Sequence, residues 1–130
     1  MSKHNLDIAE VPDLLIAEMG LTDVAATARS YRCTDASAFL VRLDELIAPK
    51  TRMLELKTVT GILEGVRDGN HIEPVVVFRE PGASRAKLLD GEHRRRVSVK
   101  LGFVEIPCIQ PSREEAEDAY GYATQREPPQ

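Results

Sequence analysis

The chain has 130 residues, of which 42% are hydrophobic and 29% are charged, a balance typical of one globular domain and not of a disordered chain. It contains no run of about 18 apolar residues, which argues against a helical membrane span. Its formal net charge of −4 argues against a protein that coats nucleic acid through unspecific phosphate contacts.

The N-terminus and the cysteines indicate a compartment. The first thirteen residues, "MSKHNLDIAEVPD", are charged and lack the apolar segment of a signal peptide. Cys33 and Cys108 do not have the close spacing of a metal or redox motif. We therefore expect a cytoplasmic protein with reduced thiols.

The first third of the chain predicts helices followed by a strand. Residues 1–36 are expected to form a helical extension, with "PDLLIAEMG" and "LTDVAATARSY" as its helices. Thr22 or Asp23 is a suitable N-cap for the second of these. The alternating pattern of "SAFLVRLDEL" then predicts a strand with Phe39, Val41 and Leu43 on one face.

The middle of the chain predicts a helix and a pair of strands. Residues 53–67 carry apolar side chains at helical spacing, and "RDGN" ends this helix with Gly69 available for a left-handed conformation. "EPVVVFRE" is a short apolar run typical of a buried strand. "PGAS" predicts a turn, and "RAKLLD" predicts the second strand.

The last third predicts a helix, a strand and a helix. The first helix runs from Glu92 to Leu101 between two glycines, and Gly102 takes the C′ position. "VEIPCIQ" predicts a strand, with Pro107 at an edge or a bulge. Ser112 and Glu115 form a capping box for a final acidic helix within residues 112–124.

The resulting element order from residue 38 is β, α, β, β, α, β, α, which predicts a mixed α/β (α+β) fold. We expect one domain over residues 37–124 and a frayed tail at 125–130.

Charge is distributed unevenly over this plan. Residues 85–100 carry six Lys and Arg side chains against Asp90 and Glu92, whereas residues 105–130 are strongly acidic. A local basic site in an acidic molecule suits a small anionic ligand better than a long anionic polymer.

The stretch "LDGEHRRR", residues 89–96, is where such a ligand is expected. The first turn of a helix presents unpaired N–H groups and the positive end of the helix dipole. Gly91 allows a phosphate to approach the backbone, and His93 and Arg94 are placed to bind its oxygens. The Glu92 carboxylate is a candidate magnesium ligand or general base.

A purely structural interpretation competes with this one. Glu92 and Arg96 are four residues apart and can pair on the helix surface. Arg95 points about 100° away from its neighbours and is then only a solubilising side chain.

Several boxes together resemble one superfamily. "NHIEPVVVF", "GEHRRR" and "LGFVEIP" resemble the N-terminal domain of the ParB/sulfiredoxin superfamily, with its "QP[IL]VV", "GERRxR" and "LGxxxIP" patterns. The resemblance covers roughly residues 38–112. It implies a small mixed sheet flanked by helices.

The resemblance also implies a ligand. In ParB proteins the second box holds the triphosphate of CTP, and here Gly91, Arg94 and Arg96 match it, while His93 replaces an arginine. The first box lines the same pocket. It adds Glu73, in place of the usual glutamine, with Pro74 and the nearby His71.

The chain departs from the family in three ways. A glutamate, Glu92, stands where sulfiredoxins have their cysteine, so we expect no sulfiredoxin activity. Only Gln125 and Arg126 remain of the "ENxQR" pattern that supports magnesium binding and hydrolysis in ParB. No helix-turn-helix domain follows, so we expect a stand-alone copy such as phages, plasmids and other mobile elements carry.

The sequence therefore predicts a protein that binds a nucleoside triphosphate, CTP or ATP, with Mg²⁺. Its predicted ligands are Gly91, His93, Arg94, Arg95, Arg96, Glu73, Pro74 and His71, with Glu92 as metal ligand and catalytic base. On this hypothesis it is an NTP hydrolase or phosphotransferase. One alternative is a non-catalytic module that contacts a protein through the acidic 112–124 helix or the N-terminal helices. Another is a DNA-binding or nuclease-like protein, which the net charge disfavours.

Overall fold

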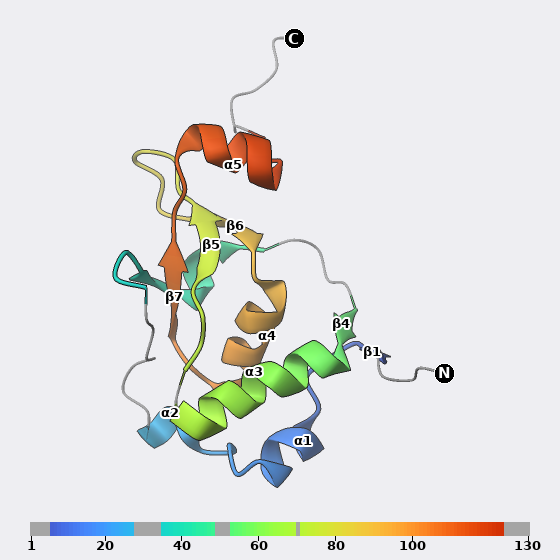
Figure 1. Ribbon diagram of the computed structural model, residues 1–130. Helices are drawn as coiled ribbons and strands as arrows, with labels where there is room; N and C mark the ends of the chain where they lie inside the picture. Colours follow the sequence, from blue (N-terminus) through green and yellow to red (C-terminus); the bar gives the residue numbers. More distant parts are fainter. Residues whose placement is uncertain (1–5, 28–34, 49–52, 70, 124–130) are drawn as a thin grey trace.

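The structure is a computed structural model that describes residues 6–27, 35–48, 53–69 and 71–123. A five-stranded sheet forms its centre, and helices lie at both ends of it (Figure 1). The elements in chain order are β1 (Asp7–Ile8), α1 (Asp13–Glu18), α2 (Val24–Thr27), β2 (Phe39–Arg42), the 3₁₀ helix η1 (Leu43–Glu45), β3 (Leu46–Ile47), β4 (Leu54–Glu55), α3 (Leu56–Gly69), β5 (Val75–Phe78), β6 (Ala86–Asp90), α4 (Glu92–Leu101), β7 (Glu105–Ile109) and α5 (Arg113–Tyr120).

The sheet has the order β2-β7-β5-β6-β3 and is mixed. β7 runs antiparallel to β2 and parallel to β5, and β6 runs antiparallel to β5 and parallel to β3. The separate ribbon of β1 and β4 is antiparallel. The mixed α+β fold predicted from the sequence is thus confirmed.

The sheet is curled. Its two edge strands, β2 and β3, are joined by η1 alone, so the chain between them spans at most about 14 Å. Five strands laid flat would separate these edges by about 19 Å. The curl encloses a core of nine residues: Val41, Leu43, Leu46, Val75, Val77, Ala86, Leu88, Ile106 and Cys108.

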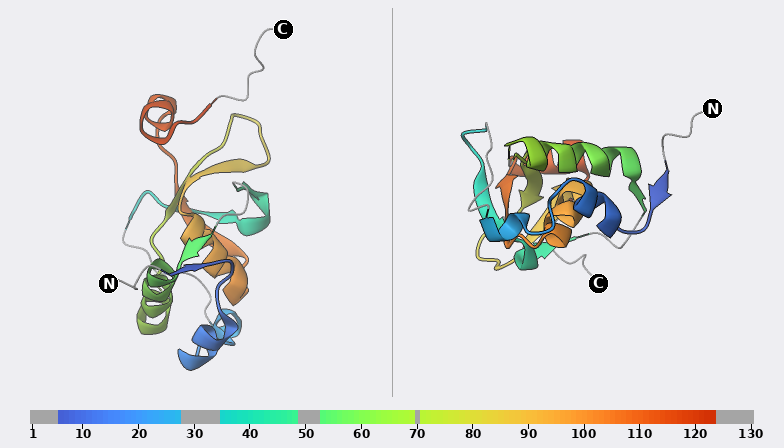
Figure 2. Two further views of the ribbon diagram at one scale, coloured as in Figure 1. Left: turned by 90° about the vertical axis from the view of Figure 1, so that its right-hand side faces the viewer. Right: turned by 90° about the horizontal axis from the view of Figure 1, so that it is seen from below.

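A second core lies between the helices at the lower end. α3 and α4 pack on each other with the N-terminal segment against them, as Figure 2 shows from below. The buried members are Val11, Ile16, Leu21, Leu54, Val59, Leu63, Val66, Ile72, Val97 and Leu101. The N-terminal residues therefore share a core with the central helices, while the boundary at residues 36 and 37 stays a prediction.

The C-terminal helix α5 is fixed to the other end of the molecule. Ala116 and Tyr122 pack on Phe78, and the Phe78 and Tyr122 rings lie 4.8 Å apart. Glu80 binds Arg113 at 2.6 Å and accepts a hydrogen bond from the Tyr122 hydroxyl. In Figures 1 and 2, α5 lies far from α3, so it takes no part in the site described below.

Most predicted elements are confirmed, and α4 has the predicted bounds. Three details are wrong. The first strand ends at Arg42, because Leu43 starts η1, although its side chain still joins the core of Val41. Gly69 is the last residue of α3 and is not among the glycines with positive φ.

The third is Pro107, which was expected at a sheet edge or a bulge. It lies in β7, inside the sheet between β2 and β5. The register with β5 begins only at Cys108, one residue later, so the missing N–H of Pro107 interrupts no pairing on that side.

Among the described residues, every helix is too short or too polar to cross a bilayer. The predicted frayed tail at 125–130 and the last four residues of the second N-terminal helix, 28–31, lie outside these ranges.

Candidate functional site

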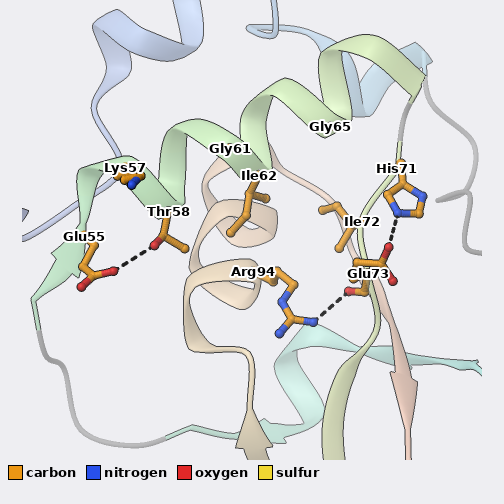
Figure 3. Close-up of a pocket in the computed structure, with 10 residues that line it drawn as sticks. All are labelled: Glu55, Lys57, Thr58, Gly61, Ile62, Gly65, His71, Ile72, Glu73 and Arg94. Atoms are coloured by element: carbon orange, nitrogen blue, oxygen red, sulfur yellow. Dashed lines mark hydrogen bonds and ion pairs between the residues drawn. The ribbon is translucent and has the colours of Figure 1, made fainter. Parts of the chain in front are cut away.

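A groove of about 700 Å³ runs along α3. Thr58, Gly61, Ile62 and Gly65 of α3 form one side of it, and residues 71–73 and Arg94 of α4 form the other (Figure 3). Glu55 and Lys57 complete it at the start of the helix. This volume falls in the range of small-molecule sites, and apolar side chains with a few polar groups are typical of them.

Gly91 joins β6 to α4 in a conformation that requires glycine. Its φ is +118°, where other residues are strained. A β-carbon there would lie 2.5 Å from Cγ1 and 2.8 Å from Cβ of Val75. Packing of α4 against β5 therefore requires Gly91, because Val75 occupies the space that a side chain at this position would need.

Arg94, in the first turn of α4, brings a positive charge to the side of the groove opposite α3 (Figure 3). Its Nη1 donates to the carbonyl oxygen of Pro74 at 2.6 Å and lies 3.5 Å from that of Glu73. Within the described ranges, Nε and Nη2 make no hydrogen bond, and no carboxylate lies within ion-pair distance of the guanidinium. Neutral carbonyls position this half-buried charge without neutralising it, so it can still attract an anion.

Arg95 and Arg96 are arranged differently. Glu92, which is 9% exposed, accepts from Nε of Arg95 at 2.7 Å and from its Nη2 at 2.9 Å. The Arg96 guanidinium lies 3.6 Å from the same carboxylate and donates to the carbonyl of Ala9 at 2.5 Å. The hydrogen bond to Glu92 raises the pKa of Arg95. Both arginines line a different depression, beside residues 9–11.

The predicted pair of Glu92 and Arg96 is thus present, at 3.6 Å. Arg95 lies closer to the Glu92 carboxylate, at 2.7 Å. Both carboxylate oxygens of Glu92 are engaged, and its roles as metal ligand and base stay predictions. Among the described residues, no group of three or more His, Cys, Asp and Glu side chains is arranged to hold a metal ion.

Replacing the carboxylate by its amide, Glu92→Gln, is expected to lower the free energy of unfolding by about 1–3 kcal/mol, since two largely buried guanidinium groups lose their counter-charge. Urea denaturation measures this loss. The control is Asp68→Asn, which breaks an exposed ion pair with Arg67 and should cost at most about 1 kcal/mol. Equal losses in the two variants would contradict the structural role of Glu92.

The remaining predicted residues lie at or next to the groove. His71 and Glu73 form a pair at 2.6 Å on the strand side, and Pro74 follows with the carbonyl that holds Arg94. Nε2 of His93 accepts a hydrogen bond from the main-chain N–H of Glu55 at 2.9 Å. The structure thus brings His71, Glu73, Pro74 and Arg94 together, with His93 at one end.

Sequence reasoning missed the α3 side of the site. Gly61 and Gly65 stand four apart in the middle of a 14-residue helix, where glycine is unfavourable, and this was the available signal. A β-carbon on Gly61 would meet nothing within 4 Å, so packing does not explain this glycine.

Cys108 is not a candidate nucleophile for a second reactive site. Cys108 is fully buried in β7, and burial raises the pKa of its thiol to about 12. A thiol that stays protonated at neutral pH is a poor nucleophile.

Comparisons with known proteins bear on the fold. The sequence matches no protein-family profile, and no curated protein matches it. Among solved structures, the C-terminally truncated chromosome-partitioning protein ParB from Caulobacter crescentus, complexed with CTP-γ-S, is 14% identical with a TM-score of 0.46. That match covers 67% of this chain and 54% of the ParB chain.

A mutant free serine kinase is another neighbour. Its complex with ADP is 20% identical with a TM-score of 0.50, and its complex with AMP is 21% identical with a TM-score of 0.48. Each match covers 64% of this chain and 34% of the kinase chain. The present chain thus spans about half the length of the ParB chain and about a third of the kinase chain. It has a ParB/sulfiredoxin-like fold: a mixed sheet flanked by helices.

Proposed function

We propose that this protein binds a nucleoside triphosphate, CTP or ATP, in the groove along α3, with the phosphates toward Arg94 and the first turn of α4. The observation that carries the proposal is the charge of Arg94. Of the three consecutive arginines, it is the one that has no carboxylate partner within the described ranges, and it borders the groove.

Three further observations support the proposal. The N-cap residue of α4 is Gly91, which has no side chain to cap the helix, so the positive end of that helix remains suited to an anion. The proteins of this fold named above were solved with CTP-γ-S, ADP and AMP. Ile62 and Ile72 give the groove an apolar surface that suits a nucleobase or a ribose.

The charges along the groove indicate how magnesium would take part. Lys57 and Arg94 are offset by the carboxylates of Glu55 and Glu73, so the lining cannot neutralise a free triphosphate. Mg²⁺ usually binds proteins through one or two carboxylates together with substrate phosphates. The Glu92 carboxylate would have to leave two guanidinium groups to bind the metal, whereas the exposed carboxylate of Glu73 would not, so Glu73 is the better placed ligand. Magnesium would supply charge neutralisation here.

Calorimetric titration with CTP, ATP and GTP, each with Mg²⁺, tests the proposal. We expect saturable heat with at least one nucleotide, and weaker binding when EDTA removes the metal. The absence of heat with all three would refute the proposal and favour the interaction module predicted as the alternative.

Filling the groove gives a separate prediction. Gly61→Ala places a methyl group into the open space along α3, so nucleotide binding should weaken, while the helix gains about 0.5–1 kcal/mol. Titration and thermal unfolding measure the two effects. Gly69→Ala, in the same helix but outside the groove lining, should leave binding unchanged. Unaltered affinity in Gly61→Ala would place the ligand elsewhere.

A further inference from the structure

The hydrogen bond between His93 and Glu55 determines which ring nitrogen of His93 carries the proton. A main-chain N–H can only donate, and it lies 2.9 Å from Nε2. Nε2 therefore has no proton while this bond exists. The ring is neutral and carries its proton on Nδ1.

Glu55 is held in place independently of His93. It pairs with Asp7 in the β1–β4 ribbon, and the N–H of the next residue, Leu56, donates to the carbonyl of Leu6 at 2.9 Å. Its carboxylate accepts from the Thr58 hydroxyl at 3.0 Å. The amide is thus a fixed partner that orients the imidazole, as outer partners orient metal-binding histidines.

His93 lies beside the groove, although it is not among the residues that line it. It is the second residue of α4, next to Arg94, and its partner Glu55 lines the groove. Within the described part of the chain, Nδ1 makes no hydrogen bond. Its proton is therefore available to a ligand at this end of the groove.

We propose that His93 binds the nucleotide phosphates as a neutral hydrogen-bond donor through Nδ1, in a tautomer fixed by the main-chain N–H of Glu55. This inference rests on the proposed function. It differs from the simple expectation of a charged histidine, because the imidazole needs no second proton to bind phosphate.

Two substitutions separate the two ring nitrogens. In His93→Asn the side-chain amide nitrogen stands near the position of Nδ1 and keeps a donor, while the bond to Glu55 is lost. In His93→Gln the amide oxygen reaches the position of Nε2 and keeps the acceptor, while the Nδ1 donor is lost. We expect His93→Gln to weaken nucleotide binding about tenfold and His93→Asn to weaken it less. Exchange of the Glu55 amide hydrogen should accelerate in the Asn variant alone.

The reverse ranking, with His93→Gln binding better than His93→Asn, would overturn the donor role and leave His93 only a structural link. A wild-type protein that binds no nucleotide would overturn the donor role together with the proposed function. The tautomer is tested without any ligand by imidazole ¹⁵N spectra. We expect a protonated Nδ1, an unprotonated Nε2 and a scalar coupling from Nε2 to the Glu55 amide nitrogen. A proton on Nε2 at neutral pH would overturn the inference even if nucleotide binds.

Discussion

Gly91→Ala is expected to destabilise the protein by about 2–5 kcal/mol, the largest effect on stability that the structure predicts. About 1–2 kcal/mol comes from a positive φ that alanine disfavours. The rest comes from the new methyl group, whose position lies 2.5 Å from Val75, too close for any contact without movement of β5 or α4. Urea denaturation measures the loss.

Gly82→Ala is the matched control for this substitution. Gly82 has a φ of +81°, but its β-carbon would meet nothing within 4 Å, so only the backbone cost of about 1–2 kcal/mol applies. The double variant Gly91→Ala with Val75→Ala should cost less than the sum of its single changes, because truncating Val75 makes room for the new methyl group. Equal losses at positions 91 and 82 would show that Gly91 does not pack on Val75. The space beside the Gly91 backbone would then be open to a ligand.

Arg94→Ala is expected to weaken nucleotide binding about 10- to 100-fold, the largest expected effect on affinity. Hydrogen bonds to charged groups contribute about 1.5–3 kcal/mol each, and this guanidinium is the charged donor that borders the groove from α4. Stability should change little, because Arg94 bonds only to the carbonyls of Pro74 and Glu73 within the described residues. Calorimetric titration beside thermal unfolding separates the two quantities.

Two variants sharpen this prediction. Arg85→Ala removes the same charge from an exposed position between β5 and β6, outside the groove lining, and should leave affinity unchanged. Arg94→Lys keeps the charge but loses the planar fork, so its affinity should fall between those of the wild type and Arg94→Ala. A loss of affinity in Arg85→Ala as large as in Arg94→Ala would mean that only the overall charge matters, which would contradict the proposed site.

The sequence was informative where a local rule and the fold agree. α4 has the predicted bounds because Gly91 and Gly102 flank it with positive φ, which other residues disfavour. β5 was recognisable from the sequence because its four residues, Val75–Phe78, are all apolar. The structure buries all four. The box that contains Arg94 was found because its residues are adjacent in the chain.

The sequence was uninformative where a contact joins distant segments. The order of the sheet, with β7 between β2 and β5, depends on the curl that encloses Ile106 and Cys108, and no local pattern records it. The same holds for the groove. Its α3 side becomes visible only when residues 71–73 are placed opposite Gly61 and Ile62.

The arginine run shows the limit most clearly. Helical spacing indicated that Glu92 and Arg96 can pair, but not that Arg95 would bind the carboxylate at 2.7 Å. Nor did it indicate that Arg94 would have no carboxylate partner among the described residues. That choice depends on side-chain burial, which spacing does not determine.

A crystal structure of the protein grown with Mg²⁺ and CTP or ATP tests the central claim most directly. We predict phosphate oxygens within hydrogen-bonding distance of the Arg94 guanidinium and of the main-chain N–H groups at the start of α4, with the rest of the nucleotide along α3. A nucleotide bound away from Arg94, or a groove that stays empty beside an unchanged Arg94–Pro74 contact at saturating nucleotide, would contradict the claim.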